Sequence, residues 1–358
     1  GVKVPGAKTV TYGGPAYYYH LATAGVWVFD TRQEPWLIKR KETLYIQTWH
    51  GTPLKKLGLD IDELHMAAET GKDEYAEAIR AESRKWDILV SPNSFSTAVF
   101  KRCFAYDGEI LECGYPRNDK LVRARKGSRK VRDKVCERLG IAKDKKILLY
   151  APTWRDDEYL GGGWYRYGSP LGFEELESKL GMDFVVILKT HYLVKLDGSE
   201  LPGRCLESGF LKVCGSDIDI TSLYIAADAL ITDYSSVMFD YSVLGRPMFF
   251  FTYDLERYRE HLRGFYFDFE QEAPGPLSES TEKLADDIVK CFDAGDKDAQ
   301  PCGEADGPAD PQRADESQPH GANERFARFC EKYCHLEDGK ASARVAARIE
   351  EFITKGRV

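Results

Sequence analysis

The sequence predicts an α/β protein whose two halves face each other across a cleft. Short apolar runs of strand length alternate with segments of helical pattern, once over residues 25–119 and again over residues 146–251. A charged, helix-like stretch, residues 119–139, lies between the two sets. Alternating strands and helices form parallel βαβ units, so the turns at the carboxyl ends of the strands should meet at one edge of each sheet. Ligands of open α/β sheets bind at that edge.

The composition is that of a globular chain with reduced cysteines. At 358 residues, of which 43% are hydrophobic, the chain is long enough for two domains. It has no apolar run of the ~20 residues that a membrane helix needs. Its start lacks the apolar core of a signal peptide. It also lacks an initiator Met, so we expect the natural N-terminus to lie upstream. Nine cysteines, an odd number without metal-type spacing, favour the cytoplasm over an oxidising compartment.

The charge is acidic overall but unevenly spread. A net charge of −8 argues against a nucleic-acid partner, because domains that bind nucleic acids carry a basic footprint. Residues 120–134, however, contain eight Lys or Arg and one Asp. This run is either a solvated helix face or a patch that attracts an anionic polymer or anionic lipid headgroups. The basic turn at residues 39–41 is a second candidate for such a patch.

In the first half, strands are predicted at residues 25–30, 44–49, 87–91 and 109–113, and helices at residues 73–85 and 94–100. His50 follows the second strand. Thr52 and Pro53 come next, and this pair is typical of a helix N-cap followed by the first helical residue. The polar residues near the strand ends should share one rim on the acceptor side of the cleft. They are His50, Thr52, Asn93, Arg117 and Asn118.

In the second half, strands are predicted at residues 146–152, 183–188, 229–231 and 247–251, with a short helix at 221–227. The polar turn 232–236 follows the third strand and leads into a helix that should end near Leu244, with Gly245 as its C-cap residue. Residues 156–172 contain five glycines without periodicity, so we expect a mobile loop there.

The polar residues after the strands of the second half match what a diphosphate needs, namely positive charge, directional donors and a helix start. One histidine after a strand, or one pair of serines at a helix start, is more often structural. Several such groups on one rim favour a phosphate site. His50, from the facing half, is placed to act as a general base on an acceptor hydroxyl. The candidate donor residues are Arg155, Lys189, His191, Asp233 (which would orient the turn), Ser235 and Ser236.

Six runs of the chain carry the motifs of a known family. They are YIQTWHGTPLKKLG (45–58), GYPRND (114–119), YAPTWR (150–155), LKTHY (188–192), LITDYSSVMFD (230–240) and LRGFYFDFE (262–270). In order and spacing they resemble the CDP-glycerol glycerophosphotransferase family of teichoic-acid synthesis, over most of residues 10–290. The resemblance implies a GT-B-like fold of two Rossmann-like domains, with the donor nucleotide on the C-terminal domain and the acceptor approaching from the N-terminal one.

The resemblance also implies roles for single residues. His50, in the Trp-His-Gly-Thr-Pro motif, would be the general base, and His191 would bind the donor pyrophosphate. Arg155, Ser235 and Ser236 would lie at the donor phosphates. The implied reaction transfers glycerol phosphate from CDP-glycerol to a hydroxyl of a lipid-linked polyol-phosphate acceptor, of the teichoic-acid or capsule type, and releases CMP. It would take place in the cytoplasm, with the enzyme peripheral on the anionic inner face of the cell membrane.

Several alternatives stay open at this point. Within the family, the enzyme would either add a single glycerol phosphate as a primer or build the polymer. The donor would be CDP-ribitol in a ribitolphosphotransferase, and a nucleotide-sugar in a GT-B glycosyltransferase. A non-catalytic module would bind the nucleotide without transferring anything. The sequence has no carboxylate cluster with clear metal-ligand spacing, so no cofactor is assigned and a requirement for Mg²⁺ is left open.

The chain divides into four expected parts. Residues 1–126 form the acceptor-side domain, shortened at its start relative to the family, and residues 127–292 form the nucleotide-donor domain. Residues 293–322, rich in Gly, Pro, Asp, Gln and Ala, have no family counterpart and should be a disordered insert or linker. Residues 323–358 form a C-terminal helix with a possible break at Gly339.

Overall fold

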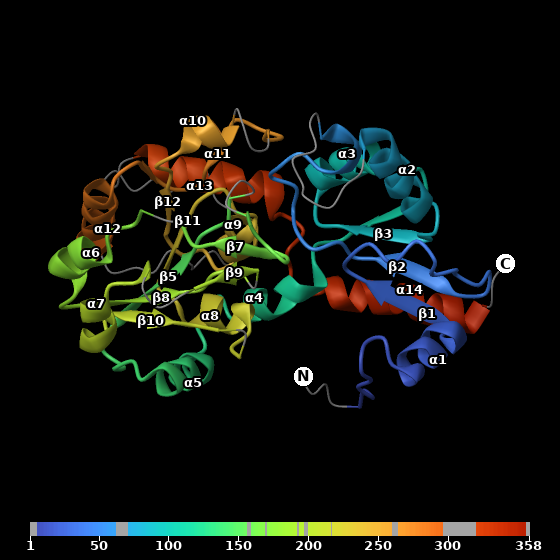
Figure 1. The fold of residues 1–358 in the computed structure, drawn as a ribbon, viewed down its shortest axis with the longest axis horizontal. Helices are drawn as coiled ribbons and strands as arrows, with labels where there is room; N and C mark the ends of the chain where they lie inside the picture. The colour runs from blue at the N-terminus through green and yellow to red at the C-terminus, as the bar shows by residue number, and fades with distance from the viewer. Residues whose placement is uncertain are drawn as a thin grey trace.

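The chain folds into two parallel α/β halves that lie side by side (Figure 1). This computed structural model describes residues 6–61, 71–155, 159–168, 170–191, 193–196, 200–215, 217–259, 264–295 and 320–355. The predicted α/β class is confirmed, and the strands of the two large sheets are parallel as expected. None of the helices in these ranges combines the length and the apolar character that crossing a membrane requires.

The first half is built on a four-stranded parallel sheet in the order β1-β2-β3-β4. Strands β2 and β3 are buried at every position because both faces of the sheet are covered. Tyr45 and Phe100 belong to the core on one face, and Ile46 and Val345 belong to the core on the other. The elements are α1 (Pro15–Thr23), β1 (Val26–Phe29), β2 (Leu44–Gln47), α2 (Lys72–Ser83), β3 (Ile88–Ser91), α3 (Ser94–Cys103) and β4 (Glu109–Glu112).

The second half is built on a six-stranded parallel sheet in the order β10-β8-β5-β11-β12-β13. The chain winds outward from β5 through β8 to β10 and then returns to β11 on the other side of β5. Such a reversal opens a crevice at the carboxyl ends of the two central strands, where α/β proteins bind ligands. The strands are β5 (Lys146–Ala151), β8 (Phe184–Leu188), β10 (Leu211–Val213), β11 (Ala229–Thr232), β12 (Met248–Phe251) and β13 (Leu277–Ser278).

Helices cover both faces of the second sheet (Figure 1). The turn predicted after β11 leads into α9, which ends two residues before the predicted end, and Gly245 follows at a φ of 69°. The helices are α5 (Arg129–Leu139), α6 (Phe173–Leu180), α7 (Gly203–Ser208), α8 (Ile220–Ala226), α9 (Val237–Ser242), α10 (Leu255–Arg257), α11 (Phe269–Glu272) and α12 (Thr281–Gly295).

The C-terminal segment returns from the second half to the first. Helix α13 (His320–Tyr333) packs on the second half, where the Phe329 ring stacks 5.2 Å from the Phe239 ring. Helix α14 (Ala341–Lys355) lies against the first sheet, and its Val345 joins the core there. Gly339, at a φ of 80°, lies between the two helices, which is where the sequence predicted a break. The segment therefore joins both halves.

The expected helix after Thr52 and Pro53 does not form. Residues 54–56 instead run alongside residues 264–266 of the second half, and Lys55 pairs with Phe265 as an antiparallel bridge. Backbone groups used in this pairing are not available for helical hydrogen bonds. A short 3₁₀ turn, η1 (Gly58–Asp60), follows.

The glycine-rich segment 156–172 is not a structureless loop. It contains the hairpin strands β6 (Tyr159–Gly161) and β7 (Trp164–Arg166), and β7 pairs in parallel with β9 (Val194–Lys195). Three successive glycines, Gly161 to Gly163, have φ values of 89°, 61° and 85° and so form the turn that other residues resist. Strands of three residues are too short to show a hydrophobic periodicity in the sequence.

Two further segments differ in detail from the expectation. The charged stretch 119–139 forms two helices, α4 (Asp119–Arg123) and α5, with Gly127 between them at a φ of 84°. A 3₁₀ turn, η2 (Pro116–Asn118), precedes α4. Helix α12 extends to Gly295, so the predicted insert cannot begin at residue 293. Helix α13 begins at His320, so the predicted insert cannot extend to residue 322 either, and its residues 296–319 lie outside the described residues.

Candidate active site

His50 lies on the loop after β2, on a locally strained backbone. Trp49, directly before it, has a φ of 54°, in the left-handed region that residues other than glycine rarely adopt. The His50 ring stacks on the Trp49 indole at 4.4 Å between centroids, and its Nδ1 lies 2.7 Å from the carbonyl oxygen of Asp30. A carbonyl can only accept, so Nδ1 of the neutral ring carries the proton and Nε2 keeps its lone pair. The exposed imidazole is therefore oriented as a general base.

The loop that carries His50 meets the second half at Gly51. A Cβ atom on Gly51 would lie 3.1 Å from Oγ of Ser236 and 3.8 Å from Nη2 of Arg117, so a larger residue would displace the serine hydroxyl. Arg117 crosses between the halves and donates to Asp240 of α9 at 2.9 Å. The predicted residues Arg117 and Ser236 thus come together beside the His50 loop.

A backbone clasp, made by residues 54–57 and 264–266, joins the two halves next to this contact. The N–H of Lys56 donates to the carbonyl of Gly264 at 2.9 Å, and the N–H of Tyr266 donates to the carbonyl of Leu54 at 3.0 Å. The clasp directs Lys55 into the second half, where its ammonium lies 4.8 Å from a tyrosine ring centroid. A lysine from the first half therefore adds its charge to the donor side of the crevice.

His191, after β8, is an uncharged hydrogen-bond donor. Burial lowers its pKa to about 4, and the positive charges of Lys55 and Lys189 lower it in the same direction. Its Nδ1 accepts from the backbone N–H of Leu193 at 3.3 Å, and its ring lies 4.1 Å from the Trp154 indole. Because Nδ1 accepts, the proton of the neutral ring is on Nε2. The single N–H group of His191 is therefore at Nε2.

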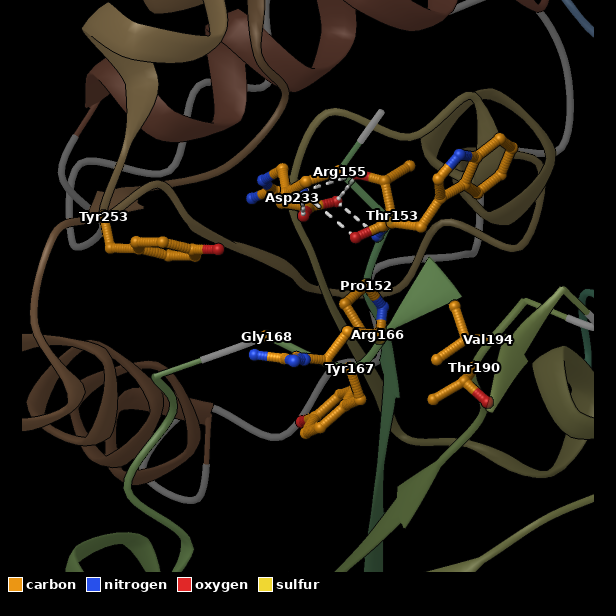
Figure 2. Close-up of a pocket in the computed structure, with 11 residues that line it drawn as sticks. Pro152, Thr153, Arg155, Arg166, Tyr167, Gly168, Thr190, Val194, Asp233 and Tyr253 are labelled. Atoms are coloured by element: carbon orange, nitrogen blue, oxygen red, sulfur yellow. Dashed lines mark hydrogen bonds and ion pairs between the residues drawn. The ribbon is translucent and has the colours of Figure 1, made fainter. Parts of the chain in front are cut away.

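Arg155, after β5, is buried in an ion-pair cluster (Figure 2). Its side chain is 3% exposed, with Nη1 2.9 Å from Asp233 and Nε 2.8 Å from Asp254. Burial lowers the pKa of Arg155, but the two carboxylates raise it well above its ordinary value. Thr153 donates its N–H to Asp233 at 2.9 Å, which ties the turn after β5 to the turn after β11. One positive charge between two carboxylates leaves none to neutralise a phosphate.

The remaining donor candidates lie at the open side of the crevice. Ser235 and Ser236 are half-buried where α9 begins, and Oγ of Ser235 accepts from the N–H of Val237 at 3.4 Å. Both hydroxyl protons can therefore be donated to a ligand. The ammonium of Lys189 donates to the carbonyl of Gly215 at 2.6 Å and keeps two further N–H groups for other partners.

Two residues of the predicted acceptor rim are buried elsewhere. Asn93 donates to the carbonyl of Tyr333 at 2.7 Å, and Asn118 donates to Glu337 at 3.0 Å. Asn93 is 0% exposed and Asn118 is 2% exposed, so neither presents a surface to an acceptor. Their side chains hold the C-terminal segment against the first half, and we leave them out of the acceptor site. Thr52 is also buried, at 4% exposure, but it stays within the His50 loop.

Sequence reasoning missed three residues beside Arg155, two of which line the pocket next to it. Tyr253 and Arg166 line this pocket, and Asp254 completes the ion-pair cluster. Asp254 follows β12 as Asp233 follows β11, so its position at a strand end was a usable signal. Arg166 lies in the glycine-rich segment, where no such sequence signal pointed to it. Within the described ranges, no group of three or more His, Cys, Asp or Glu is arranged to hold a metal ion.

Comparisons with known proteins agree on one family. The family described as CDP-Glycerol:Poly(glycerophosphate) glycerophosphotransferase matches residues 2–305. The chain is 40% identical over 337 residues to a teichoic acid poly(glycerol phosphate) polymerase of Bacillus spizizenii, covering 94% of this chain and 76% of that protein. It is 40% identical over 341 residues to a teichoic acid glycerol-phosphate transferase of Staphylococcus aureus, covering 95% of this chain and 79% of that protein.

The fold has a solved counterpart. The structure of the wall teichoic acid polymerase TagF superposes with a TM-score of 0.82 and 34% identity, covering 99% of this chain and 79% of that one. The resemblance noted in the sequence and the expected GT-B-like fold are both confirmed.

Proposed function

The chain belongs to the CDP-glycerol:poly(glycerophosphate) glycerophosphotransferase family, and we infer from this that it transfers glycerol phosphate from CDP-glycerol to a hydroxyl group and releases CMP. The observation that supports this most directly is the contact of Gly51 with Ser236. It sets the loop of a general base, His50, against the helix start that we assign to the donor phosphates. The two partners of the reaction would therefore meet across one crevice.

In the proposed step, the acceptor oxygen attacks the phosphorus that bears the glycerol. A new P–O bond forms as the bond from this phosphorus to the bridging oxygen breaks, and CMP leaves with that oxygen and its electron pair. Nε2 of His50 takes the hydroxyl proton as the attack proceeds. The carbonyl of Asp30 accepts from Nδ1, so it holds the ring in the right tautomer and stabilises the imidazolium that forms.

Donors of the second half would stabilise the charge that builds on the leaving CMP. We assign this role to His191 through Nε2–H, to the hydroxyls of Ser235 and Ser236, and to the ammonium of Lys189. The low pKa of His191 means that it donates a hydrogen bond without changing protonation in neutral solution. Arg155 contributes indirectly, because it holds the turns that carry these groups.

The test is CMP release from CDP-glycerol with a short glycerol-phosphate acceptor. His50→Ala should lower kcat by about 10²–10⁴-fold, the usual contribution of a general base. His20→Ala, an exposed histidine on α1, is the matched control and should leave kcat unchanged. If His50→Ala keeps more than about a tenth of the wild-type rate, the base assignment is wrong. Binding of CDP-glycerol without CMP release from the wild type would instead favour a binding module.

A donor panel separates the remaining alternatives. CDP-glycerol, CDP-ribitol and nucleotide-sugars should be compared at equal concentration, with CMP or nucleotide release as the readout. We expect the highest kcat/KM for CDP-glycerol. A preference for CDP-ribitol would identify a ribitolphosphotransferase, and a preference for a nucleotide-sugar would identify a glycosyltransferase.

We further propose a lipid-linked acceptor and peripheral attachment to an anionic membrane through the basic run 120–134. Arg125 and Arg132 of this run are used internally, since they donate to backbone carbonyls of the second half and the C-terminal segment. Five exposed or half-buried side chains have no ion pair or hydrogen bond with any residue that the structure describes. They are Arg123, Lys126, Arg129, Lys130 and Lys134.

The alternative basic turn is less suited to lipid. Lys39 pairs with Asp87 at 2.9 Å, and Arg40 donates to the carbonyl of Ala24 at 3.0 Å. Co-sedimentation with vesicles containing phosphatidylglycerol should therefore fall when Lys126, Arg129 and Lys130 are changed to Gln, and it should fall with added salt. Binding that ignores both lipid charge and salt would contradict the attachment.

A further inference from the structure

The hairpin of β6 and β7 is attached directly to the donor side of the crevice. Its strand β7 pairs with β9, so that Tyr165 lies opposite Val194 and Arg166 opposite Lys195. Strand β9 begins three residues after His191, and the Tyr165 ring lies 5.8 Å from the Trp154 indole that also contacts His191. Whatever this hairpin presents to the pocket is therefore presented beside the donor histidine.

At the wall formed by Arg155, the pocket next to His191 has more negative than positive charge. It is lined by residues from the ends of β5, β8, β11 and β12 and from the hairpin, and Figure 2 shows Arg155 and Asp233 on one wall with Thr190 and Val194 on another. Asp233 balances the positive charge of Arg155, and Asp254 makes the cluster negative overall, because two carboxylates surround one guanidinium. An anion bound against this wall needs a cation other than Arg155, because Lys55 and Lys189 lie on the side of His191.

Arg166 is that cation. Its side chain lines the pocket, is exposed, and makes no hydrogen bond or ion pair with any residue in the described ranges. The indole N–H of Trp154, which lines the same pocket, is buried without an acceptor among the described residues. Both groups can only donate hydrogen bonds, so the pocket suits a ligand that is rich in hydrogen-bond acceptors. A guanidinium suits a phosphate because its N–H groups bind two oxygens at once.

We propose that Arg166 binds the diphosphate of the donor. It would thus have the phosphate-binding role that the sequence suggested for Arg155. The proposal rests on the proposed function for the identity of the ligand, a nucleoside diphosphate ester. The two arginines of this pocket would then have different roles. Arg155 holds the scaffold together, and Arg166, carried on the hairpin, contacts the substrate.

The experiment measures the Kd of CDP-glycerol, of CMP and of cytidine by calorimetry for the wild type, Arg166→Gln and Arg166→Lys. Loss of a charge-assisted phosphate contact should raise the Kd of CDP-glycerol and CMP about 10- to 100-fold in Arg166→Gln, and lysine should restore part of the loss. Cytidine, which has no phosphate, should bind the variants as it binds the wild type. The melting temperature should not change, because Arg166 is exposed.

Arg138→Gln is the matched control, since Arg138 is an exposed arginine of the same half that pairs with Asp217 away from the pocket. It should leave all three affinities unchanged. An Arg166→Gln variant that binds CDP-glycerol within twofold of the wild type overturns the inference, and so does an equal loss of cytidine and CMP affinity. These outcomes are independent of turnover: a wild type that binds CDP-glycerol but releases no CMP would refute the proposed function and leave the Arg166 result readable.

Discussion

Replacing Arg155 with Gln should destabilise the second half, and the loss of donor affinity should follow from that. The Arg155 side chain is 3% exposed, and its two partners, Asp233 and Asp254, are 4% and 7% exposed. Its guanidinium also lies 5.2–5.3 Å from the ring centroids of three tyrosines. Removing one partner of such a buried cluster leaves carboxylates without counter-charge, which costs about 3–5 kcal/mol. That is a large part of the ~5–15 kcal/mol that stabilises an ordinary domain.

Urea unfolding followed by circular dichroism measures this free energy. Arg138→Gln is the control, because Arg138 and Asp217 form an exposed pair, with side chains 56% and 51% exposed, and such pairs contribute less than about 1 kcal/mol. A second change, Asp254→Asn in the Arg155→Gln background, should recover part of the lost stability because it removes one of the uncompensated charges.

One result would refute this reasoning. If Arg155→Gln unfolds within about 1 kcal/mol of the wild type and only its Kd for CDP-glycerol rises, the buried cluster is not what holds the turns together. Arg155 would then be a direct ligand of the donor phosphates, as the resemblance to the family implies, and the division of roles between Arg155 and Arg166 would be wrong.

Three other predictions concern the junction and the donor site. Burial raises the pKa of Glu337 from 4.5 to about 7, so the folded state holds this proton more tightly than the unfolded state does. The free energy of unfolding therefore falls by up to about 3 kcal/mol as the pH rises from 4.5 to 7. Glu337→Gln should remove this loss and make the protein more stable than the wild type at pH 8; equal urea midpoints at that pH would contradict it. His191, with its pKa lowered to about 4, should bind CDP-glycerol in its neutral form, so the Kd should stay flat from about pH 5.5 to 8. A Kd that tightens as the pH falls through ~6.5, and does so only while His191 is present, would show an imidazolium instead. Gly51→Ala should push the Ser236 hydroxyl aside and raise the KM for CDP-glycerol several-fold, whereas Gly25→Ala, where nothing lies within 4 Å, should not; equal KM values for the two variants would mean that Ser236 does not touch the donor.

Local patterns in the sequence were sufficient for the eight longer strands and for the class of site, but not for the short strands β10 and β13 at the two edges of the second sheet. The eight apolar runs became strands of two parallel sheets, because burial of a short β-branched or aromatic run depends mainly on that run itself. His50 and His191 could be singled out for the same kind of reason. Each lies three residues after the end of a strand, and parallel sheets collect such residues at one edge.

The partner of each polar group was decided only by tertiary structure. Asn93 and Asn118 follow strand ends as His50 does, but their side chains turn to a C-terminal segment more than 200 residues away. In the sequence, Arg155 has the position of a phosphate ligand, yet its guanidinium pairs with Asp254, 99 residues later. Hydrogen bonds and ion pairs act over a few ångströms, so they depend on which segments the fold brings together and not on local pattern.

Backbone pairing across the two halves likewise could not be predicted from the sequence. Thr52 and Pro53 have the local preference for a helix start, but the segment after them pairs with residues 264–266, and this pairing supplies the hydrogen bonds that a helix would have supplied. The glycine-rich segment became a hairpin because β9, after His191, offers β7 a partner strand. Helix and strand preferences amount to a fraction of a kcal/mol per residue, so long-range pairing overrides them wherever the fold provides a partner.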